Sequence, residues 1–408
     1  MTSFKRLAFS TLAVGILWSA PAHATNVLVI IGDDIAVDKV SGYAADYAAQ
    51  GYAPNYLPDT PAIDGIGAAG LRFTRAWATP LCSPTRASFQ TGKHPFRTGV
   101  GTALGSNAEG VDPAAHLMMA ESFHNFGYST GFFGKWHIGT KDSANHLGYP
   151  GTSPFFDEPH PVLSGWDRFF GIYDGYPGAG RSFFDWPRVG WIGGVGGSGH
   201  TADETEHHTD RTSEVAQNWI ARQDGPWLAV VAFSAPHSPD TSSYAWQYGD
   251  ADVTQYRTPA LSCLATSSCG NEPRAVYQAL AEHVDLQIEA LLNGIDPQVM
   301  DDTLIFFVGD NGTPTAVAEA PFDAAGRGKG TTYENGVRVP LVVADGATWR
   351  TGAAGRIASP GREADIAVSS TDIYQTIHEV LLGVGVLGVD SDSFAVCFGN
   401  TDPMCGYT

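Results

Sequence analysis

The chain has 408 residues, of which 43% are hydrophobic and 16% are charged, and its formal net charge is −20 at pH 7. This composition excludes a disordered chain, and a chain so acidic is not expected to bind nucleic acid. An anionic substrate would be repelled at long range and must be held by local cations, so each lysine or arginine near a motif is informative.

The first 24 residues have the pattern of a signal peptide. Lys5 and Arg6 precede an apolar run over residues 7–18, and residues 22–24 offer the small side chains that a signal peptidase reads. The apolar run is short for a membrane span, and no later stretch approaches the roughly 20 apolar residues that a membrane helix needs. We therefore expect a periplasmic or secreted protein without a membrane span.

Four apolar runs predict buried strands, and polar residues follow the carboxyl end of each. The strands are expected at 26–31, 128–133, 227–233 and 303–308. The polar residues that follow them are Asp33 and Asp34, then Lys135 and His137, then His237, and finally Asp310 and Asn311. Open α/β sheets bind their ligands at the carboxyl ends of their strands. One ligand site is therefore expected there.

Helical patterns fill the gaps between these strands, which predicts an α/β fold with a large, mostly parallel sheet flanked by helices. Asp112 and Pro113 indicate the start of a helix that stops at Gly127. Further helices are expected at 212–222, 274–292 and 371–382. On the helix expected at 274–292, His283 and Asp285 are predicted to lie at the surface.

Other polar residues are assigned structural roles. His207 and His208 follow an acidic stretch at 203–206, which favours a solvated face over a metal site. Lys93, His94 and Arg97 are expected to support the turn before them through packing and charge.

The glycine-rich segment 150–200 carries eleven aromatic residues. They could stack on sugar rings or on an aryl group, or they could pack in the core, and the sequence leaves both open. The residues are Phe155, Phe156, Trp166, Phe169, Phe170, Tyr173, Tyr176, Phe183, Phe184, Trp186 and Trp191.

Five cysteines leave one without a partner. Cys263 with Cys269, and Cys397 with Cys405, form two close pairs that an oxidising compartment would favour as disulfides. Cys82 is the odd cysteine, and it lies in the sequence Cys82-Ser-Pro-Thr-Arg86. This spacing alone does not decide whether Cys82 is a nucleophile, a buried structural thiol or a site of modification.

The acidic strand ends are candidates for a metal site. Asp33, Asp34, Asp310 and Asn311 offer hard oxygen ligands, which suit Ca²⁺ or Mg²⁺ and are poor for zinc. Taken alone, Asp33 and Asp34 could cap a helix, and Asp310-Asn311-Gly312 could be a plain turn. Two adjacent carboxylates after a buried strand need a cation, which favours the metal.

The sequence around Cys82 resembles the signature of the sulfatase family, Cys-x-Pro-x-Arg followed by Thr-Gly, with Gln90 as a departure from the usual aliphatic residue. Further stretches resemble sulfatase motifs in the same order, and the resemblance runs from residue 25 to about residue 383. These stretches are 60–64, 70–74, 134–139, 165–171, 235–239 and 328–340.

The resemblance implies an alkaline-phosphatase-like α/β sandwich and a catalytic domain over residues 25–383. It also implies that a maturation enzyme converts Cys82 to formylglycine and that the site binds Ca²⁺, with Mg²⁺ or Mn²⁺ as substitutes. The implied metal ligands are Asp33, Asp34, Cys82, Asp310 and Asn311, and the implied catalytic residues are Cys82, Arg86, Lys135, His137, His237 and Lys329.

The expected activity is hydrolysis of a sulfate ester of a small molecule or a glycan. The hydrated aldehyde would attack sulfur, His237 or Lys329 would protonate the leaving oxygen, and His137 would take the second hydroxyl proton. A phosphonate or phosphate ester hydrolase of the same superfamily and an inactive binding homologue are the alternatives. Residues 384–408 are too few for the usual C-terminal subdomain, so we expect it to be reduced or absent, with a disulfide in the tail.

Overall fold

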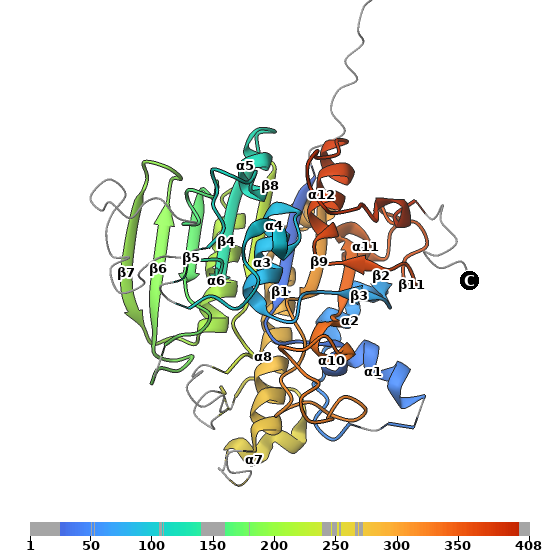
Figure 1. The fold of residues 1–408 in the computed structure, drawn as a ribbon. Helices are drawn as coiled ribbons and strands as arrows, with labels where there is room; N and C mark the ends of the chain where they lie inside the picture. Colours follow the sequence, from blue (N-terminus) through green and yellow to red (C-terminus); the bar gives the residue numbers. More distant parts are fainter. Residues whose placement is uncertain are drawn as a thin grey trace, which may run out of the picture.

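The computed structural model describes residues 25–399 except for 50, 53, 106–107, 109, 140–159, 179, 239–245, 247–250, 253, 266–267 and 269–271. Its described strands form a ten-stranded sheet and a separate two-stranded sheet (Figure 1). The predicted signal peptide, residues 1–24, lies outside the described residues. The order of the large sheet is β11-β2-β10-β9-β1-β8-β4-β5-β6-β7.

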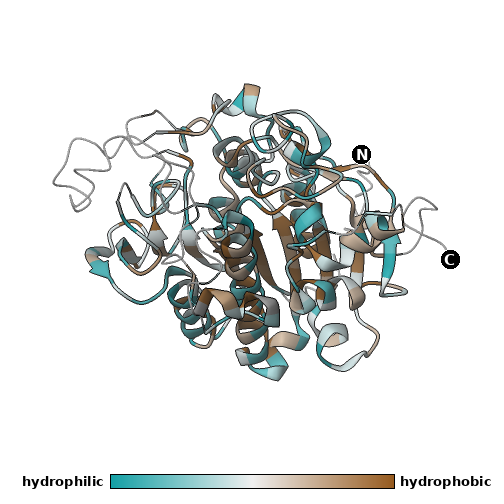
Figure 2. Cartoon of the chain, turned by 90° about the horizontal axis from the view of Figure 1, so that it is seen from below, coloured by the Kyte–Doolittle hydropathy of each residue, from teal (hydrophilic) through white to brown (hydrophobic). Residues whose placement is uncertain are grey.

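The centre of the sheet is parallel and fully buried. It consists of β9 (Thr303–Gly309), β1 (Asn26–Gly32), β8 (Trp227–Ala232) and β4 (Ser129–Lys135). All four predicted strands are therefore confirmed, with shifts of one or two residues at some ends. Strands buried on both faces need apolar side chains at nearly every position, and Figure 2 shows these central strands as the most hydrophobic part of the chain.

Strands of mixed direction extend the sheet on both sides. On one side lie β10 (Leu341–Asp345), β2 (Gly70–Phe73) and β11 (Arg362–Ala364), and on the other β5 (Arg168–Ile172), β6 (Trp186–Ile192) and β7 (Ser198–Glu204). β10, β6 and β7 pair antiparallel with their neighbours, whereas β5 and β11 pair parallel with β4 and β2. The two-stranded sheet pairs β3 (Ala76–Trp77) with β12 (Val368–Ser369).

Helices cover both faces of the sheet, as β1 demonstrates. Leu28 and Ile30 pack in one core cluster with residues of α8 (Pro273–Gly294), and Val27 and Val29 pack in a second cluster with residues of α12 (Asp372–Leu382). The α/β sandwich is thus confirmed. The remaining α-helices are α1 (Ser41–Ala48), α2 (Pro61–Ala68), α3 (Cys82–Thr91), α4 (Pro95–Thr98), α5 (Met119–His124), α6 (His208–Ile220), α7 (Ser262–Ala265), α9 (Pro297–Asp301), α10 (Glu334–Val337) and α11 (Gly346–Thr351).

The predicted helices at 212–222, 274–292 and 371–382 correspond to α6, α8 and α12. The helix predicted from Asp112 is wrong at its start, because α5 begins only at Met119. The Asp112 carboxylate accepts a hydrogen bond from the Ala114 N–H at 2.9 Å and closes a local turn instead.

Two predictions of surface position are also wrong. His207 and His208 are 2% and 0% exposed, and His283 and Asp285 are 1% and 0% exposed. The reason is that α8 has neighbours on its polar side as well: Asp285 accepts hydrogen bonds from two N–H groups at the start of α2, and His283 Nε2 lies 2.8 Å from Asp210 of α6. Helical periodicity alone identifies the apolar face and does not reveal such contacts.

The aromatic segment mostly builds the core. Within it, β5 and β6 join the large sheet, and the side chains described as buried favour packing over an exposed stacking surface; Phe155 and Phe156 lie outside the described residues. The buried aromatic residues are Trp166, Phe169, Phe170, Tyr173, Phe183, Trp186 and Trp191.

Cys263 and Cys397 are disulfide-bonded, while their expected partners, Cys269 and Cys405, lie outside the described residues. Cys397 is buried and packs with Phe394 and Phe398 in the same core cluster as α12, so the described part of the tail lies against the main body. None of the helices in the described ranges has the length and apolar character to cross a membrane.

Candidate active site

The carboxylates of the site come from two neighbouring strands. β1 and β9 pair in parallel with Gly32 opposite Gly309, so Asp33 and Asp34 leave the sheet beside Asp310 and Asn311. The Asp34 N–H donates to Asp310 Oδ1 at 3.2 Å, and the Asn311 amide donates to Asp34 Oδ1 at 2.7 Å. Each of these four residues is at most 2% exposed. The register of β1 with β9 therefore fixes where these acidic side chains lie relative to one another.

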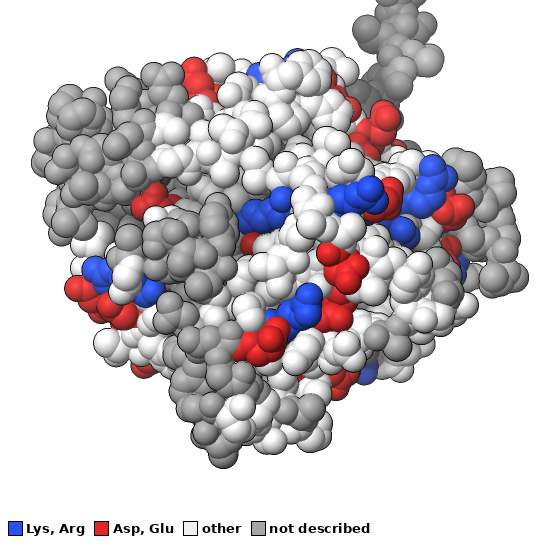
Figure 3. Space-filling view, turned by 60° about the horizontal axis from the view of Figure 1, so that its bottom comes forward, with Lys and Arg blue, Asp and Glu red and all other residues white. Residues whose placement is uncertain are grey.

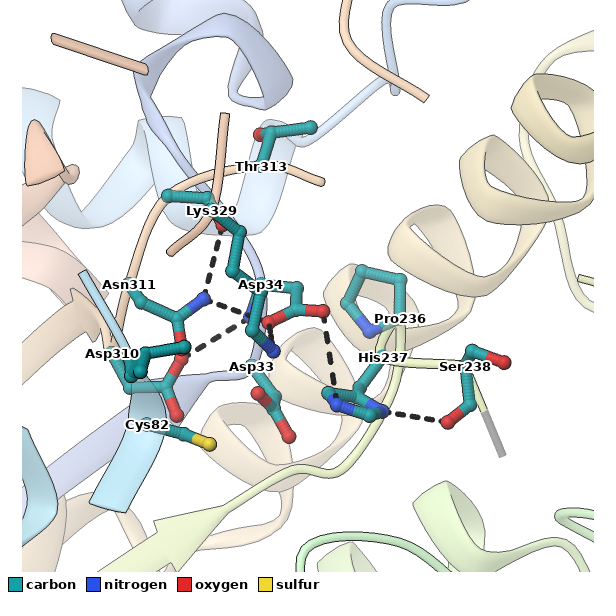
Figure 4. A network of polar contacts seen from close by, with 12 residues as sticks. Asp33, Asp34, Cys82, Pro236, His237, Ser238, Asp310, Asn311, Thr313 and Lys329 are labelled. Atoms are coloured by element: carbon teal, nitrogen blue, oxygen red, sulfur yellow. Dashed lines mark hydrogen bonds and ion pairs between the residues drawn. The ribbon is translucent and has the colours of Figure 1, made fainter. Parts of the chain in front are cut away.

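Three cations neutralise these carboxylates. Arg86 of α3 donates from Nε to Asp310 Oδ2 at 2.9 Å and from Nη1 to the Lys135 carbonyl at 2.6 Å. Lys135, the last residue of β4, pairs through Nζ with Asp33. Lys329, in the loop before α10, pairs through Nζ with Asp34. Figure 4 shows Asp34 between Lys329, Asn311 and His237, with Asp33 and Cys82 close by.

The acidic group also has the properties of a cation site. Burial raises the pKa of Asp33 and of Asp310, so their charged forms depend on positive groups nearby. Asp33 Oδ1 and Asn311 Oδ1 are buried and have no hydrogen-bond partner among the described residues. Ligand atoms of Asp33, Asp34 and His237 lie within 4.8 Å of one another. The carboxylate and amide oxygens of this group fit a hard divalent cation such as Ca²⁺.

Cys82 is the first residue of α3, and it is 2% exposed and not disulfide-bonded. Its Sγ lies 3.2 Å from His137 Nδ1. His137 Nε2 lies 2.9 Å from the Leu104 carbonyl oxygen, which can only accept, so Nε2 carries the hydrogen. His137 Nδ1 is therefore the nitrogen that accepts a hydrogen from position 82.

The backbone at this histidine is constrained. His137 has a φ of 54° and Asp34 a φ of 64°, a left-handed conformation that is uncommon outside glycine and often found at functional sites. Burial, then the charge of Lys135, lowers the pKa of His137 to about 3. The imidazole is thus neutral in this environment, and its Nδ1 lone pair is available to accept a hydrogen bond.

His237 follows β8 and approaches the carboxylates from the other side. Its Nε2 lies 4.0 Å from Asp34 Oδ2, and its Nδ1 lies 2.6 Å from the Ser238 carbonyl oxygen. Nδ1 therefore carries the hydrogen, and in the neutral ring Nε2 offers a lone pair to the site. Burial, reinforced by Lys329, lowers the pKa of His237 well below its ordinary value.

The structure thus brings together every residue that the sequence places in the site: Asp33, Asp34, Cys82, Arg86, Lys135, His137, His237, Asp310, Asn311 and Lys329. On the face drawn in Figure 3, the basic side chains are few and most lie beside acidic ones.

Sequence reasoning missed Gly175. A Cβ on Gly175 would lie 2.5 Å from His137 Cε1, so the backbone of this loop rests directly on the imidazole ring. Only glycine allows such close approach at this point. Glycine is abundant between residues 150 and 200, and nothing in the sequence sets this one apart.

Other candidate residues lie outside the site. Lys93 Nζ contacts His116, and Arg97 pairs with Asp390 near the tail, so neither reaches Cys82. His207, Asp210 and His283 come close enough to share an ion. The His283–Asp210 hydrogen bond, together with the cap that His207 Nδ1 provides to the Thr209 N–H, gives these groups a structural role.

Comparison with known proteins identifies relatives of this chain. The family model described as Sulfatase matches residues 25–384. Bovine (Bos taurus) arylsulfatase A is 29% identical over 88% of this chain, and the steryl-sulfatase of Mus musculus is 26% identical over 90%. The chain spans 64% of the length of each of these two relatives.

Solved structures share the fold. Ps i-CgsB, crystallised with k-i-k-neocarrahexaose, has a TM-score of 0.69 at 22% identity, covering 93% of this chain and 77% of its own. The phosphonate monoester hydrolase of Agrobacterium radiobacter has a TM-score of 0.58 at 19% identity, covering 93% of this chain and 78% of its own.

Proposed function

The chain belongs to the sulfatase family, and from this premise we propose that it hydrolyses sulfate esters and releases inorganic sulfate. The observation that carries the proposal is the convergence of Arg86, Lys135 and Lys329 on buried carboxylates beside Cys82. Such a group of cations suits an anionic ester in a protein that is otherwise strongly acidic.

We propose that Asp33, Asp34, Asp310 and Asn311 hold a divalent cation, Ca²⁺ in preference, with position 82 contributing once it is modified. Asp33 Oδ1 and Asn311 Oδ1, which have no hydrogen-bond partner within the described part of the chain, support this assignment. When bound, the cation would neutralise charge on the sulfate oxygens and favour ionisation of a hydroxyl beside it. Chelation is expected to abolish turnover, measured as sulfate release before and after Ca²⁺ is restored.

We further propose that Cys82 is converted to formylglycine by a maturation enzyme. As a hydrated aldehyde this residue supplies one hydroxyl that can attack sulfur and a second whose deprotonation lets sulfate leave. His137 Nδ1, 3.2 Å from Cys82 Sγ, is placed to take a proton from the group at position 82. Arg86 orients Asp310 and, with Lys135, supplies positive charge beside the attacking group.

Two residues are candidates to assist the leaving oxygen. The Nδ1 hydrogen of His237 is engaged by the Ser238 carbonyl, and its Nε2 is the accepting nitrogen of the neutral ring. Lys329 is an ammonium with three donors, and the Asp34 carboxylate raises its pKa despite burial. We therefore assign Lys329 the role of a charged hydrogen-bond donor to the leaving oxygen, and His237 a binding role.

The substrate is proposed to be a sulfated glycan or a sulfated small molecule. Among the structural neighbours, one was crystallised with k-i-k-neocarrahexaose and another with D-glucosamine-2-N,6-O-disulfate. A desulfation screen over sulfated monosaccharides, polysaccharides and aryl sulfates would choose between these classes. Turnover of aryl sulfates alone would count against a glycan.

A phosphonate or phosphate ester hydrolase is the second candidate, because one neighbour with the same fold is a phosphonate monoester hydrolase. Matched aryl sulfate, phosphate and phosphonate esters with one common leaving group separate the two. We expect sulfate release to exceed phosphate or phosphonate hydrolysis. The reverse order would replace the proposed function, and no turnover by formylglycine-containing enzyme with Ca²⁺ would indicate an inactive binding homologue.

We propose that the protein acts in the periplasm or outside the cell. Cys263 and Cys397 each take part in a disulfide bond, which supports an oxidising compartment. Residues 1–24 have the pattern of a signal peptide. Fractionation of cells that express the full chain tests this. Recovery of uncleaved protein in the cytoplasm alone would contradict it.

A further inference from the structure

Thr313 lies two residues beyond Asn311 and is fully buried. Its hydroxyl donates to Asp38 Oδ1 at 2.7 Å and accepts from the Ala36 N–H at 3.3 Å. Its backbone carbonyl accepts from the Lys329 N–H at 2.9 Å. Thr313 therefore connects the segment after β1, the segment after β9 and the loop that carries Lys329, and Figure 4 shows it beside Lys329.

These contacts close a ring. Lys329 Nζ pairs with Asp34, the Lys329 N–H donates to Thr313, and the Thr313 hydroxyl contacts the Ala36 N–H two residues after Asp34. The position of the Lys329 backbone relative to Asp34 is thus set through Thr313. Without the hydroxyl, Thr313 would lose its contacts with Asp38 and with the Ala36 N–H, so the carbonyl that holds the Lys329 N–H would belong to a residue less firmly fixed to the segment after β1.

Asp38, which accepts from this hydroxyl, and its chain neighbour Lys39 are both buried ionisable residues. Asp38 is 4% exposed and Lys39 is 0% exposed, and the Lys39 ammonium lies 5.3 Å from the centre of the Tyr277 ring. The Tyr277 hydroxyl donates to the Asp34 carbonyl at 2.7 Å. Burial raises the pKa of Asp38, and Lys39 opposes this shift. Because Asp38 and Lys39 have no part in the proposed reaction, their burial needs another explanation.

We propose that Thr313, held by Asp38, is a positioning residue that sets where the Lys329 ammonium meets the leaving oxygen. The inference rests on the proposed function, because Lys329 needs a leaving group to act on. Its physical basis is that a flexible loop places an ammonium accurately only where its backbone is anchored. Thr313 provides that anchor from a segment already fixed by strand β9.

Thr313→Val tests the proposal, since it replaces the hydroxyl with a methyl group of similar size. We expect kcat/KM to fall about tenfold for phenyl sulfate and less than about threefold for 4-nitrophenyl sulfate, because a poor leaving group depends more on the Lys329 donor. Thr313→Ser keeps the hydroxyl and should restore most of the loss on phenyl sulfate. All rates are normalised to the formylglycine content of each preparation.

Thr376→Val is the matched control. Thr376 is also fully buried, and its hydroxyl accepts from the Phe394 N–H at 3.0 Å, but it lies on α12 away from the site. It should lower Tm without changing the ratio of the two rates. If Thr313→Val is poorly folded, Asp38→Asn weakens the same anchor and should show the same dependence on the leaving group.

Equal losses on both esters, or no loss in Thr313→Val, would overturn the positioning role while leaving the sulfatase proposal intact. Failure of the wild-type, formylglycine-containing enzyme to release sulfate from either ester would instead remove the proposed function, and the positioning role with it. The two failures are therefore distinguishable by the wild-type rate.

Discussion

Lys135 and Lys329 bring the same group, an ammonium, to neighbouring carboxylates from different scaffolds. Lys135 ends the buried strand β4, and its side chain is 0% exposed where it meets Asp33. Lys329 lies in a loop, and its side chain is 11% exposed where it meets Asp34. The strand-borne lysine is fixed by sheet register, whereas the loop-borne lysine depends on hydrogen bonds such as the one to Thr313. We expect the first to contribute to stability and reaction together, and the second mainly to the reaction.

The largest effect is expected for Asp310, the carboxylate that pairs with Arg86 beside the two lysine pairs. Asp310→Ala should abolish turnover, because it removes a proposed metal ligand and leaves the buried guanidinium of Arg86 without its main partner. Sulfate release and Tm, each measured with and without Ca²⁺, check this. Wild-type protein should gain Tm from Ca²⁺ and the variant should not. A variant that keeps substantial turnover would contradict the assignment of Asp310.

Lys135→Met tests the contribution of the lysine that ends strand β4. The change keeps the apolar stem but removes the closer partner of Asp33, which is then left buried with Arg86 Nη2 at 4.0 Å, and breaking a buried pair costs about 3–5 kcal/mol. We expect both a large loss of kcat/KM and a clear fall in the free energy of unfolding, measured by denaturant titration. Near-native stability would show that strand position gives this pair no structural role.

Lys329→Met makes the same chemical change at the lysine in the loop before α10. We expect kcat/KM to fall by roughly two orders of magnitude, the ~2.7–4 kcal/mol typical of one preorganised donor to a developing charge. Because the side chain is partly exposed, the loss of stability should be smaller than for Lys135→Met. Good leaving groups should suffer less than poor ones. The comparison fails if the two variants lose stability equally.

The smallest of these effects is expected at a second loop. Gly175→Ala should lower kcat by roughly one order of magnitude, because its Cβ would meet the His137 ring at 2.5 Å and move Nδ1 away from position 82. Gly101→Ala is a control, since a Cβ there meets nothing within 4 Å. Equal activity of the two variants would show that the Gly175 backbone does not position His137.

The strand-borne half of the site could be predicted from the sequence. Apolar runs that end in Asp33-Asp34 and in Asp310-Asn311 indicate parallel strands, and parallel strands bring their carboxyl ends to one edge. The resemblance to sulfatases added Lys329, whose loop carries little physical signal of its own, and it gave a catalytic role to His237, which the strand-end pattern had already placed at this edge of the sheet. Gly175 and Thr313 stayed hidden, because their contacts join segments that are distant in the chain.

The errors have a related cause. Asp112 and Pro113 fit a helix start locally, but a side-chain hydrogen bond to the Ala114 N–H favours a turn. His283 and Asp285 were assigned to the surface because they lie off the apolar stripe of α8, yet they cap and contact neighbouring helices. Single-sequence patterns reveal what a residue does within its own element and miss polar contacts between elements.

The most direct test of the central claim is the chemical state of residue 82 in active protein. Peptide mass spectrometry of protein produced with and without a formylglycine-generating enzyme gives the fraction modified, and sulfate release is measured on the same samples. We expect formylglycine at position 82 in proportion to activity and no turnover by Cys82→Ser, whose single hydroxyl can accept sulfate but cannot expel it. Full activity in protein that carries only the unmodified Cys82 thiol would contradict this expectation.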